Sequence, residues 1–329
     1  MCHALATGFL IFAERHMQMT PFLKQVADHY YKTGNIEERC FIFPNRRSMV
    51  FFRKYLAEAV SGRPLLLPPM MTINDLFGKA SGLHVADRVR LLLELYGCYQ
   101  VLNPHAEALD EFIFWGDVIL GDFNDVDKYL VDAAQLFTNV ADFKALQDTF
   151  EYLTDTQREA IKAFLSHFND QSGKLTVDIG ADDVKSRFLQ IWNILYPLYV
   201  AFNESLKAKG TAYEGMAYRS LADRLKKAPA EEVLSELAEG TSGFVFVGLN
   251  ALNECEKVLL RKLRDVRLAE FCWDWSGEMI RDARNRSSYF MADNVMEFPQ
   301  AAQWDIEGLG IPEINVVSVA SSVGQAKRL

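Results

Sequence analysis

The chain has 329 residues, with 44 acidic and 35 basic side chains and a net charge of −9. Half of the residues are hydrophobic and 24% are charged, a composition that excludes collagen-like, disordered and disulfide-scaffold proteins. No apolar run reaches the roughly 18 residues that a membrane span needs, so we expect no membrane partner. The acidic balance disfavours tight stand-alone binding of nucleic acid, although it allows a local basic patch.

The cysteines and histidines give no sign of a metal site. The five cysteines are far apart and form no CxxC pair, and none of the six histidines belongs to a metal-binding motif. Free thiols in a reducing compartment explain these cysteines best, which predicts a cytoplasmic protein without a metal cofactor.

The two ends differ from the rest of the chain. Residues 1–18 contain one apolar tract, Gly8–Ala13, and Met1–Thr7 has no basic residue, so we expect no signal peptide here. Because Met17 and Met19 follow soon after, we interpret residues 1–18 as an extension or a misplaced start. Ile314–Val319 predicts a strand, and Gln325–Leu329 then opens a helix, so we expect residues 313–329 to begin a second, truncated lobe.

The N-terminal part alternates helix and strand signals. Thr20 and Pro21 predict a helix start, with threonine as N-cap and proline at the first helical position. A later helix starts near Thr72-Ile73-Asn74, with Thr72 or Asn74 as its cap. The spacing of apolar residues predicts a helix, a buried strand, a loop and a second helix over these segments: Pro21–Tyr31, Cys40–Phe43, Pro44–Ser48 and Met49–Val60.

The middle of the chain predicts only helices. Residues 84–227 repeat apolar positions every three or four residues, and strand signals are nearly absent. Within this block we expect Gln171–Asp183 to be the main surface loop. After residue 240 the pattern predicts, in order, a strand, a helix capped by its first residue, and a second strand: Gly243–Gly248, Asn253–Leu263 and Leu268–Trp275.

Strand–helix alternation on both sides of a helical block predicts an α/β fold with a parallel sheet. We therefore expect an α/β domain made of residues 19–83 and 228–312, interrupted by a helical insertion domain over residues 84–227.

The sequence lacks the motifs of a nucleotide-hydrolysing enzyme. No phosphate loop of the form GxxxxGK[ST] exists, and the strand Phe244–Val247 runs into Gly248 instead of a carboxylate. No catalytic triad can be assembled from the sequence, so we expect no cofactor and no catalysis by this chain.

Two other patterns have simple structural interpretations. The acidic stretch Asp122–Asp127 fails the calcium-loop pattern because Val126 stands at a ligand position. We interpret it as a solvated helix start, where acids are favoured by the helix dipole. A run of aromatic residues either stacks on bases or packs in the core, and we favour the core for Phe112, Phe114, Trp115, Phe123, Tyr129 and Phe137.

Arg46 and Arg47 directly follow a predicted strand, with Asn45 and Ser48 beside them. Loops after parallel strands are where α/β sheets bind ligands. Two arginines together with helix-start amides can hold a phosphate. The alternative is an ordinary solvated loop and helix start.

Several segments together resemble one family, from about Thr20 to Leu329. Their order and spacing are similar to the N-terminal part of an AddB-like (RecB-related) helicase–nuclease with a C-terminal PD-(D/E)XK nuclease domain. The resemblance lies in these segments: FIFPNRRSMVFFRKYL, MTINDLF, FIFWGDVILGDFNDVDKYLVDAAQLF, YLTDTQREAIKAF, KGTAYEGMAYRSLA and FVFVGLNALNECEKVLLRKL.

The resemblance implies a RecA-like (P-loop NTPase-like) α/β domain with a helical insertion. In that family FIFPNRR and MTINDLF match motifs that touch single-stranded DNA. Val247 and Gly248 stand where an active motor has the acidic Walker-B pair, so the resemblance implies a degenerate motor. It also places the nuclease acids beyond residue 329. The implied DNA contacts in this chain are Asn45, Arg46, Arg47, Ser48, Thr72 and Asn74.

Two functions follow as expectations. The first is an inactive helicase-like module of a DNA-repair helicase–nuclease, which processes double-strand breaks for recombination. Such a module binds single-stranded or end DNA weakly and docks on an AddA-like helicase–nuclease subunit. The alternative is a purely structural protein-interaction scaffold without DNA contact.

Overall fold

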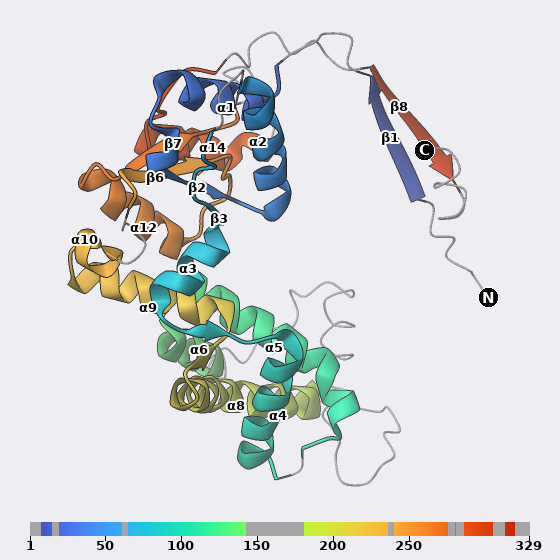
Figure 1. Cartoon of the computed structure of the whole chain (residues 1–329). Coiled ribbons are helices and arrows are strands. Elements are labelled where there is room, and N and C mark those ends of the chain that lie inside the picture. Colours follow the sequence, from blue (N-terminus) through green and yellow to red (C-terminus); the bar gives the residue numbers. More distant parts are fainter. Residues whose placement is uncertain are drawn as a thin grey trace.

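The structure, a computed structural model, contains a parallel sheet of four strands (Figure 1). Residues 8–14, 20–60, 65–104, 106–142, 181–235, 240–275, 280, 286–304 and 313–319 are described. The sheet has the order β3-β2-β6-β7, so strands from both ends of the chain are neighbours. Its strands are β2 (Arg39–Phe43), β3 (Met70–Thr72), β6 (Gly243–Val247) and β7 (Ala269–Cys272).

Helices cover both faces of this sheet. Helices α1 (Phe22–Thr33) and α2 (Arg46–Ala59) pack on one face, and α3 (Ile73–Ser81) and α12 (Glu254–Asp265) on the other. Successive residues of a strand point to opposite faces. Phe41 therefore joins the α1–α2 core and Ile42 the α3–α12 core. Burial on both faces explains why the strands are continuous apolar runs rather than alternating ones.

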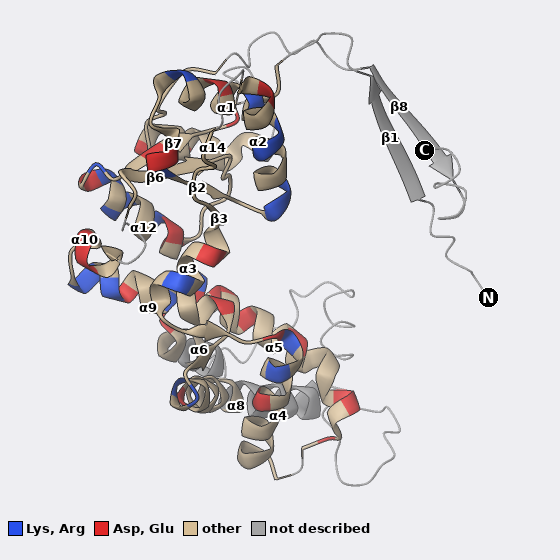
Figure 2. Cartoon of the chain, in the orientation of Figure 1, with Lys and Arg blue, Asp and Glu red and all other residues tan. Residues whose placement is uncertain are grey.

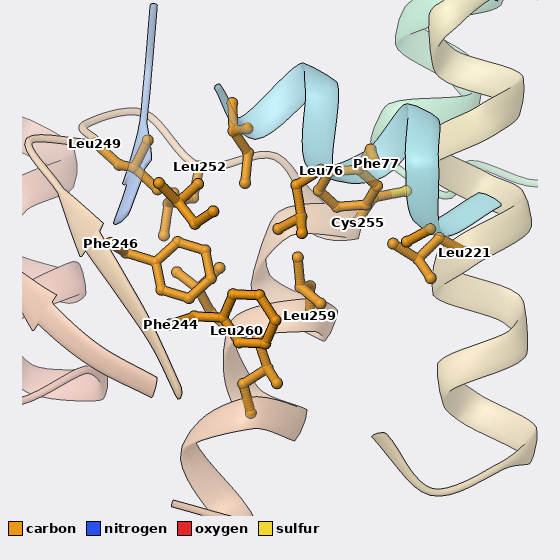
Figure 3. Close-up of a cluster of buried hydrophobic side chains, with 14 of the residues drawn as sticks. Leu76, Phe77, Leu221, Phe244, Phe246, Leu249, Leu252, Cys255, Leu259 and Leu260 are labelled. Atoms are coloured by element: carbon orange, nitrogen blue, oxygen red, sulfur yellow. The ribbon is translucent and has the colours of Figure 1, made fainter. Parts of the chain in front are cut away.

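The core beneath α3 and α12 is aliphatic and aromatic. Phe244 and Phe246 of β6 meet Leu259 and Leu260 of α12, while Leu76 extends this core from α3 (Figure 3). All five side chains are almost fully buried, with exposed fractions of 1% or less. The expected α/β architecture with a parallel sheet is thus confirmed.

Two helix starts differ from the prediction. The N-cap of α1 is Pro21 rather than Thr20, and no side chain caps this helix. The amides of Lys24 and Gln25 instead donate to the carbonyl of Pro21. Helix α2 begins at Arg46, so the expected loop Pro44–Ser48 is too long. The helix starts earlier because Asn45 caps it. The side-chain oxygen of Asn45 accepts a hydrogen bond from the Ser48 amide in the first turn.

For α3, the structure shows Thr72 rather than the alternative Asn74 as the cap, and the predicted cap of α12 is confirmed. Thr72 caps α3 and forms a capping box with Asp75, while Asn253 caps α12 and forms one with Glu256. In each box the cap side chain accepts from the third helical amide, and the acid accepts from the cap amide.

The middle segment is mainly but not wholly helical. Its main helices are α4 (Arg88–Leu102), α5 (Leu109–Lys128), α6 (Ala133–Asp142), α8 (Ala181–Ala208) and α9 (Glu214–Lys227). A parallel pair of short strands, β4 (His84–Val85) and β5 (Thr211–Ala212), corrects the expectation of an all-helical block. They pair where the chain enters and leaves this segment. Each strand has only two residues, which is too few to produce the alternating sequence pattern that predicts a strand.

Helix α9 belongs to two cores. Met216 and Ala217 pack among the helices of the middle segment, whereas Leu221 and Leu225 pack in the core beneath the sheet. Between them, Tyr218 stacks on Phe77 of α3, with ring centroids 3.8 Å apart and planes 5° from parallel. The two cores are therefore joined through one continuous helix.

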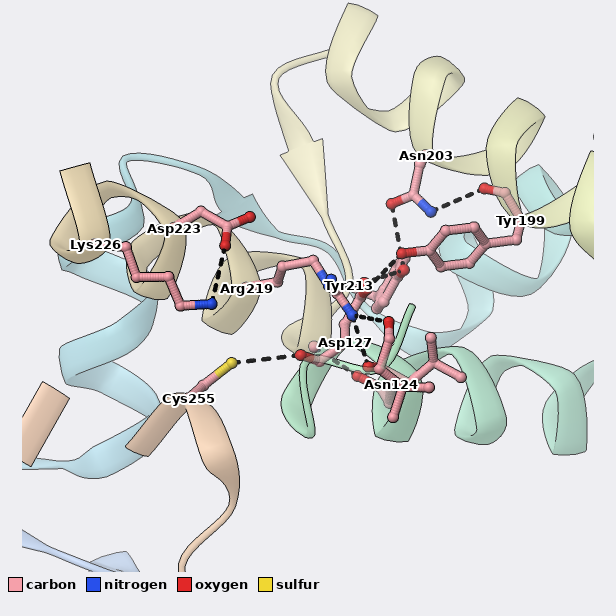
Figure 4. Close-up of polar contacts among 12 residues, drawn as sticks. Asn124, Asp127, Tyr199, Asn203, Tyr213, Arg219, Asp223, Lys226 and Cys255 are labelled. Carbon is pink, nitrogen blue, oxygen red and sulfur yellow. Dashed lines mark hydrogen bonds and ion pairs between the residues drawn. The ribbon is translucent and has the colours of Figure 1, made fainter. Parts of the chain in front are cut away.

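A buried carboxylate lies beside this junction. Asp127 is 1% exposed and accepts hydrogen bonds from the hydroxyls of Tyr199 and Tyr213 (Figure 4). It also forms an ion pair with Arg219, whose Nε lies 2.6 Å from Oδ1. The thiol of Cys255 donates to the Asp127 backbone carbonyl at 3.3 Å, so α12 is tied to α5.

This finding corrects the interpretation of the acidic stretch. Asp122–Asp127 lies in the C-terminal part of α5, not at a helix start. The helix dipole disfavours an acid there. Asp122 and Asp125 are exposed, whereas Asp127 is buried and its charge is matched by a guanidinium and two hydroxyls.

The aromatic residues of the middle segment divide into two groups. Burial is confirmed for four of them, at exposed fractions of 5% or less: Phe112, Trp115, Phe123 and Phe137. It is wrong for Phe114 and Tyr129, which are 73% and 52% exposed. Phe114 lies on the side of α5 away from the core, and Tyr129 lies just beyond the end of that helix.

The remaining elements are short or lie near the ends. They are a 3-10 helix at Ile36–Glu38, α10 (Ala230–Val233), a 3-10 helix at Arg286–Ser288 and α14 (Tyr289–Glu297). Strand β1 (Gly8–Glu14) pairs antiparallel with β8 (Glu313–Val319), the strand expected near the C-terminal end. Most of the expected loop Gln171–Asp183 falls outside the described residues. None of the described helices is long and apolar enough to cross a membrane.

Candidate functional site

The carboxyl edge of the sheet gathers most of the predicted site residues. Asn45 follows β2, Thr72 ends β3 and Gly248 follows β6. From β2 the chain moves outward to β3, whereas from β6 it moves the other way to β7. The direction of winding thus changes between β2 and β6. In open α/β sheets, ligands bind outside the carboxyl ends of the strands at such a point.

At the end of β2, capping and ligand-binding groups are separate. The side-chain oxygen of Asn45 accepts from the Ser48 amide at 3.0 Å and from its hydroxyl at 3.3 Å. These bonds commit the Asn45 oxygen and the Ser48 hydroxyl to the start of α2, and the NH2 group of Asn45 can still donate. Arg46 and Arg47 are exposed, and neither forms an ion pair or a hydrogen bond through its side chain within the described residues. The two guanidinium groups are therefore the charged groups at this position that can bind an anion.

At the end of β3, Thr72 and Asn74 have different surroundings. Thr72 is only 7% exposed, and its hydroxyl is used in the capping box with Asp75. Asn74 is exposed, but its side-chain oxygen accepts a hydrogen bond of 2.6 Å from the Tyr218 hydroxyl. This bond orients the amide, so its NH2 group is the part of Asn74 that can donate to a phosphate.

A carboxylate lies between the two loops. Although burial opposes it, the hydrogen bonds from Thr72 hold the pKa of Asp75 below its ordinary value, with Arg46 and Lys79 contributing. Arg46 therefore lies within electrostatic range of Asp75, as expected for residues at the ends of the neighbouring strands β2 and β3. The negative charge of Asp75 also reduces the attraction of this edge for an anion.

At the end of β6, the backbone turns sharply beside an aromatic ring. Val247 is buried, and Gly248 adopts a φ of 68° while its amide donates to the carbonyl of Cys272 at 2.8 Å. A Cβ on Gly248 would lie 3.5 Å from the ring of Phe22, at the start of α1. Phe22 in turn packs edge-on against Trp304 at 5.9 Å between centroids.

The start of α1 is thus lined by apolar groups. A helix N-terminus at the carboxyl edge of a parallel sheet is a favourable phosphate site, because its free amides face the ligand. At α1 the cap is Pro21, which has no amide hydrogen, and the first helical side chain is the Phe22 ring beside Gly248. This part of the edge is better suited to packing than to holding a nucleotide.

The rest of the described chain offers little other chemistry. No group of three or more potential metal ligands occurs among the described residues. Burial raises the pKa of both Cys255 and Cys272 to about 12, which makes these thiols poor nucleophiles at neutral pH.

An apolar cavity of about 410 Å³ lies between α5, α6 and α8. Phe123, Phe137 and Leu195 are among its lining residues, together with the carboxylates of Asp122 and Asp125. Burial raises the pKa of Asp122, and the neighbouring Asp125 adds to this effect. Two like negative charges repel an anionic ligand, so this cavity does not extend the basic site.

Sequence reasoning missed three residues that shape the site. Asp75 modifies the charge near Arg46, Tyr218 orients Asn74, and Phe22 packs beside Gly248. Only Asp75 could have been found from the sequence, because an acid three residues after Thr72 is the pattern of a capping box.

No protein-family model matches the chain, and no curated protein matches it in sequence.

Proposed function

We propose that this chain is a helicase-like module without a working motor, which guides single-stranded DNA weakly at the carboxyl edge of a RecA-like sheet. It docks on an AddA-like motor subunit of a cytoplasmic helicase–nuclease that processes DNA breaks. The observation that carries the proposal is the exposed pair Arg46 and Arg47 on the first turn of α2, at the switch point of the sheet.

The chemistry of this pair fits a phosphate backbone. Each guanidinium can donate two parallel hydrogen bonds to a phosphate, and the start of α2 adds a partial positive charge. Asn74 can add one neutral donor from the neighbouring loop. Phosphate contacts of this kind position a strand without reading its sequence.

The end of β6 supports the degenerate motor. Hydrolysis of a nucleotide needs a carboxylate near the metal and a loop of free amides around the phosphates. Here Gly248 follows the strand, and Phe22 occupies the neighbouring start of α1. In this proposal the motor activity comes from the partner subunit.

Two features of the chain favour weak binding. The whole chain has a net charge of −9, and Asp75 lies within electrostatic reach of Arg46. Affinity for nucleic acid depends on how many phosphates are neutralised, and two arginines neutralise few.

The scaffold alternative has one observation in its favour. The side-chain oxygen of Asn45 and the hydroxyls of Ser48 and Thr72 are used in hydrogen bonds at helix starts. Arg46, Arg47 and the NH2 groups of Asn45 and Asn74 then remain for DNA, and a surface with so few contacts is compatible with a purely structural role.

Fluorescence anisotropy with labelled single-stranded DNA at low salt tests the proposal. We expect binding that is much weaker in the double variant Arg46→Ala/Arg47→Ala. The matched control is Lys226→Ala/Lys227→Ala, which removes the same charge from exposed positions at the end of α9. Equal affinities of these two variants would contradict the DNA site and favour the scaffold.

A further inference from the structure

The outward face of α2 carries a stripe of aromatic and basic side chains. Residues four apart lie one above the other on a helix, so Arg47, Phe51 and Tyr55 form one row. Phe51 is 43% exposed, and its ring lies 6.3 Å from that of Tyr55 with a tilt of 31°. The row begins at the proposed DNA site and continues along the helix.

A second row beside it is basic. Arg46 and Lys54 lie eight residues apart, or about two helical turns, on this side of α2, and Arg53 is exposed beside them. Basic side chains therefore lie both at the start of α2 and further along it (Figure 2).

The acid on this helix is already paired. Glu58 lies 4.0 Å from the Lys54 ammonium and 3.6 Å from that of Lys24 on α1. Up to Lys54, the outward face of α2 therefore carries positive charge in a chain whose net charge is −9.

We propose that this face continues the DNA path, with a base of the single strand stacked on the Phe51 ring and phosphates near Arg47 and Lys54. The inference rests on the proposed function and deepens it, because it assigns the base contact that the carboxyl edge lacks. Base–aromatic stacking with a neighbouring positive groove is the common mode of sequence-independent single-strand binding.

The alternation of charge and ring favours nucleic acid over a protein partner. A single strand presents phosphates and flat bases in alternation, which matches Arg47 and Phe51 in one row. A protein partner would bind the largest apolar area of this face. In that case Val50, which is 59% exposed, would contribute as much to binding as Phe51.

The test measures the anisotropy of labelled oligothymidine and of an abasic oligonucleotide of equal length, with the full chain. We expect Phe51→Ala and Phe51→Leu to weaken oligothymidine binding roughly tenfold, and Phe51→Trp to retain it. Val50→Ala is the matched control and should leave the affinity unchanged. On abasic DNA the wild type should bind no better than Phe51→Ala does.

The outcomes separate this inference from the proposed function. If Phe51→Ala and Phe51→Leu bind like the wild type while Arg46→Ala/Arg47→Ala binds much more weakly, the edge site stands and the stacking face is wrong. If the wild type binds no DNA at low salt, the proposed function itself is wrong. Equal losses in Val50→Ala and Phe51→Ala would also overturn the stacking face, because they indicate a general apolar surface.

Discussion

The hydroxyl of Tyr218, in α9, donates a hydrogen bond of 2.6 Å to the side-chain oxygen of Asn74, in α3. This bond links the last helix of the middle segment to Asn74, a candidate DNA contact. The Tyr218 ring at the same time stacks on Phe77, so one residue serves both the core and the site.

Tyr218→Phe should separate these two roles. The ring and its stacking remain, and loss of one hydrogen bond should lower the free energy of unfolding by about 1 kcal/mol. Tyr218→Ala also removes the ring and should cost about 3–5 kcal/mol. Urea denaturation of both variants measures the difference, and equal losses would show that the hydroxyl, not the ring, dominates.

The buried carboxylate of Asp127 should be essential for folding. Asp127→Asn removes the negative charge that pairs with Arg219 and leaves the guanidinium without its ionic partner, which typically costs about 3–5 kcal/mol. Asp125→Asn is the control, because Asp125 is exposed and should change stability by less than about 0.5 kcal/mol. Similar denaturation midpoints for the two variants would contradict the network.

Glu256 should make stability depend on pH. Burial raises its pKa from 4.5 to about 7, against the opposing hydrogen bond from the Asn253 amide and the nearby Lys128. A raised folded-state pKa means that the native protein binds the proton more tightly than the unfolded chain. The contribution is therefore complete below pH 4.5 and is lost as the pH rises through 7.

Glu256→Gln isolates this effect. Between these pH values the unfolding free energy of the wild type should fall relative to that of the variant by about 3 kcal/mol, the equivalent of the pKa shift. Denaturant titrations across the range provide the measurement. A constant difference between the two proteins would show that Glu256 titrates normally.

The sequence predicts three of the four sheet strands and the caps of α3 and α12, because these depend on local signals. It does not predict β3, which is only three residues long. The short apolar runs of β2 and β6 are typical of strands buried on both faces, and Thr72 and Asn253 are residues that cap helices well. For α2 the apolar pattern predicts a start at Met49, three residues after the observed start at Arg46. The helix begins earlier because its cap, Asn45, precedes Arg46.

The remaining errors concern long-range contacts. Asp127 looks like one more acid of a solvated stretch, since its partners Tyr199 and Tyr213 are 72 and 86 residues further along the chain. The same holds for the site, where Phe22 meets Gly248 from the other end of the chain. Such contacts leave no period or spacing in a single sequence.

The salt dependence of single-strand binding tests the central claim most directly. Each phosphate neutralised by an arginine adds about 0.7 to the slope of log affinity against log salt concentration for a single strand. If Arg46 and Arg47 both contact phosphates, the slope of Arg46→Ala/Arg47→Ala should be shallower than that of the wild type by about 1.4. Identical slopes for the two proteins would contradict the account, since DNA would then be bound elsewhere.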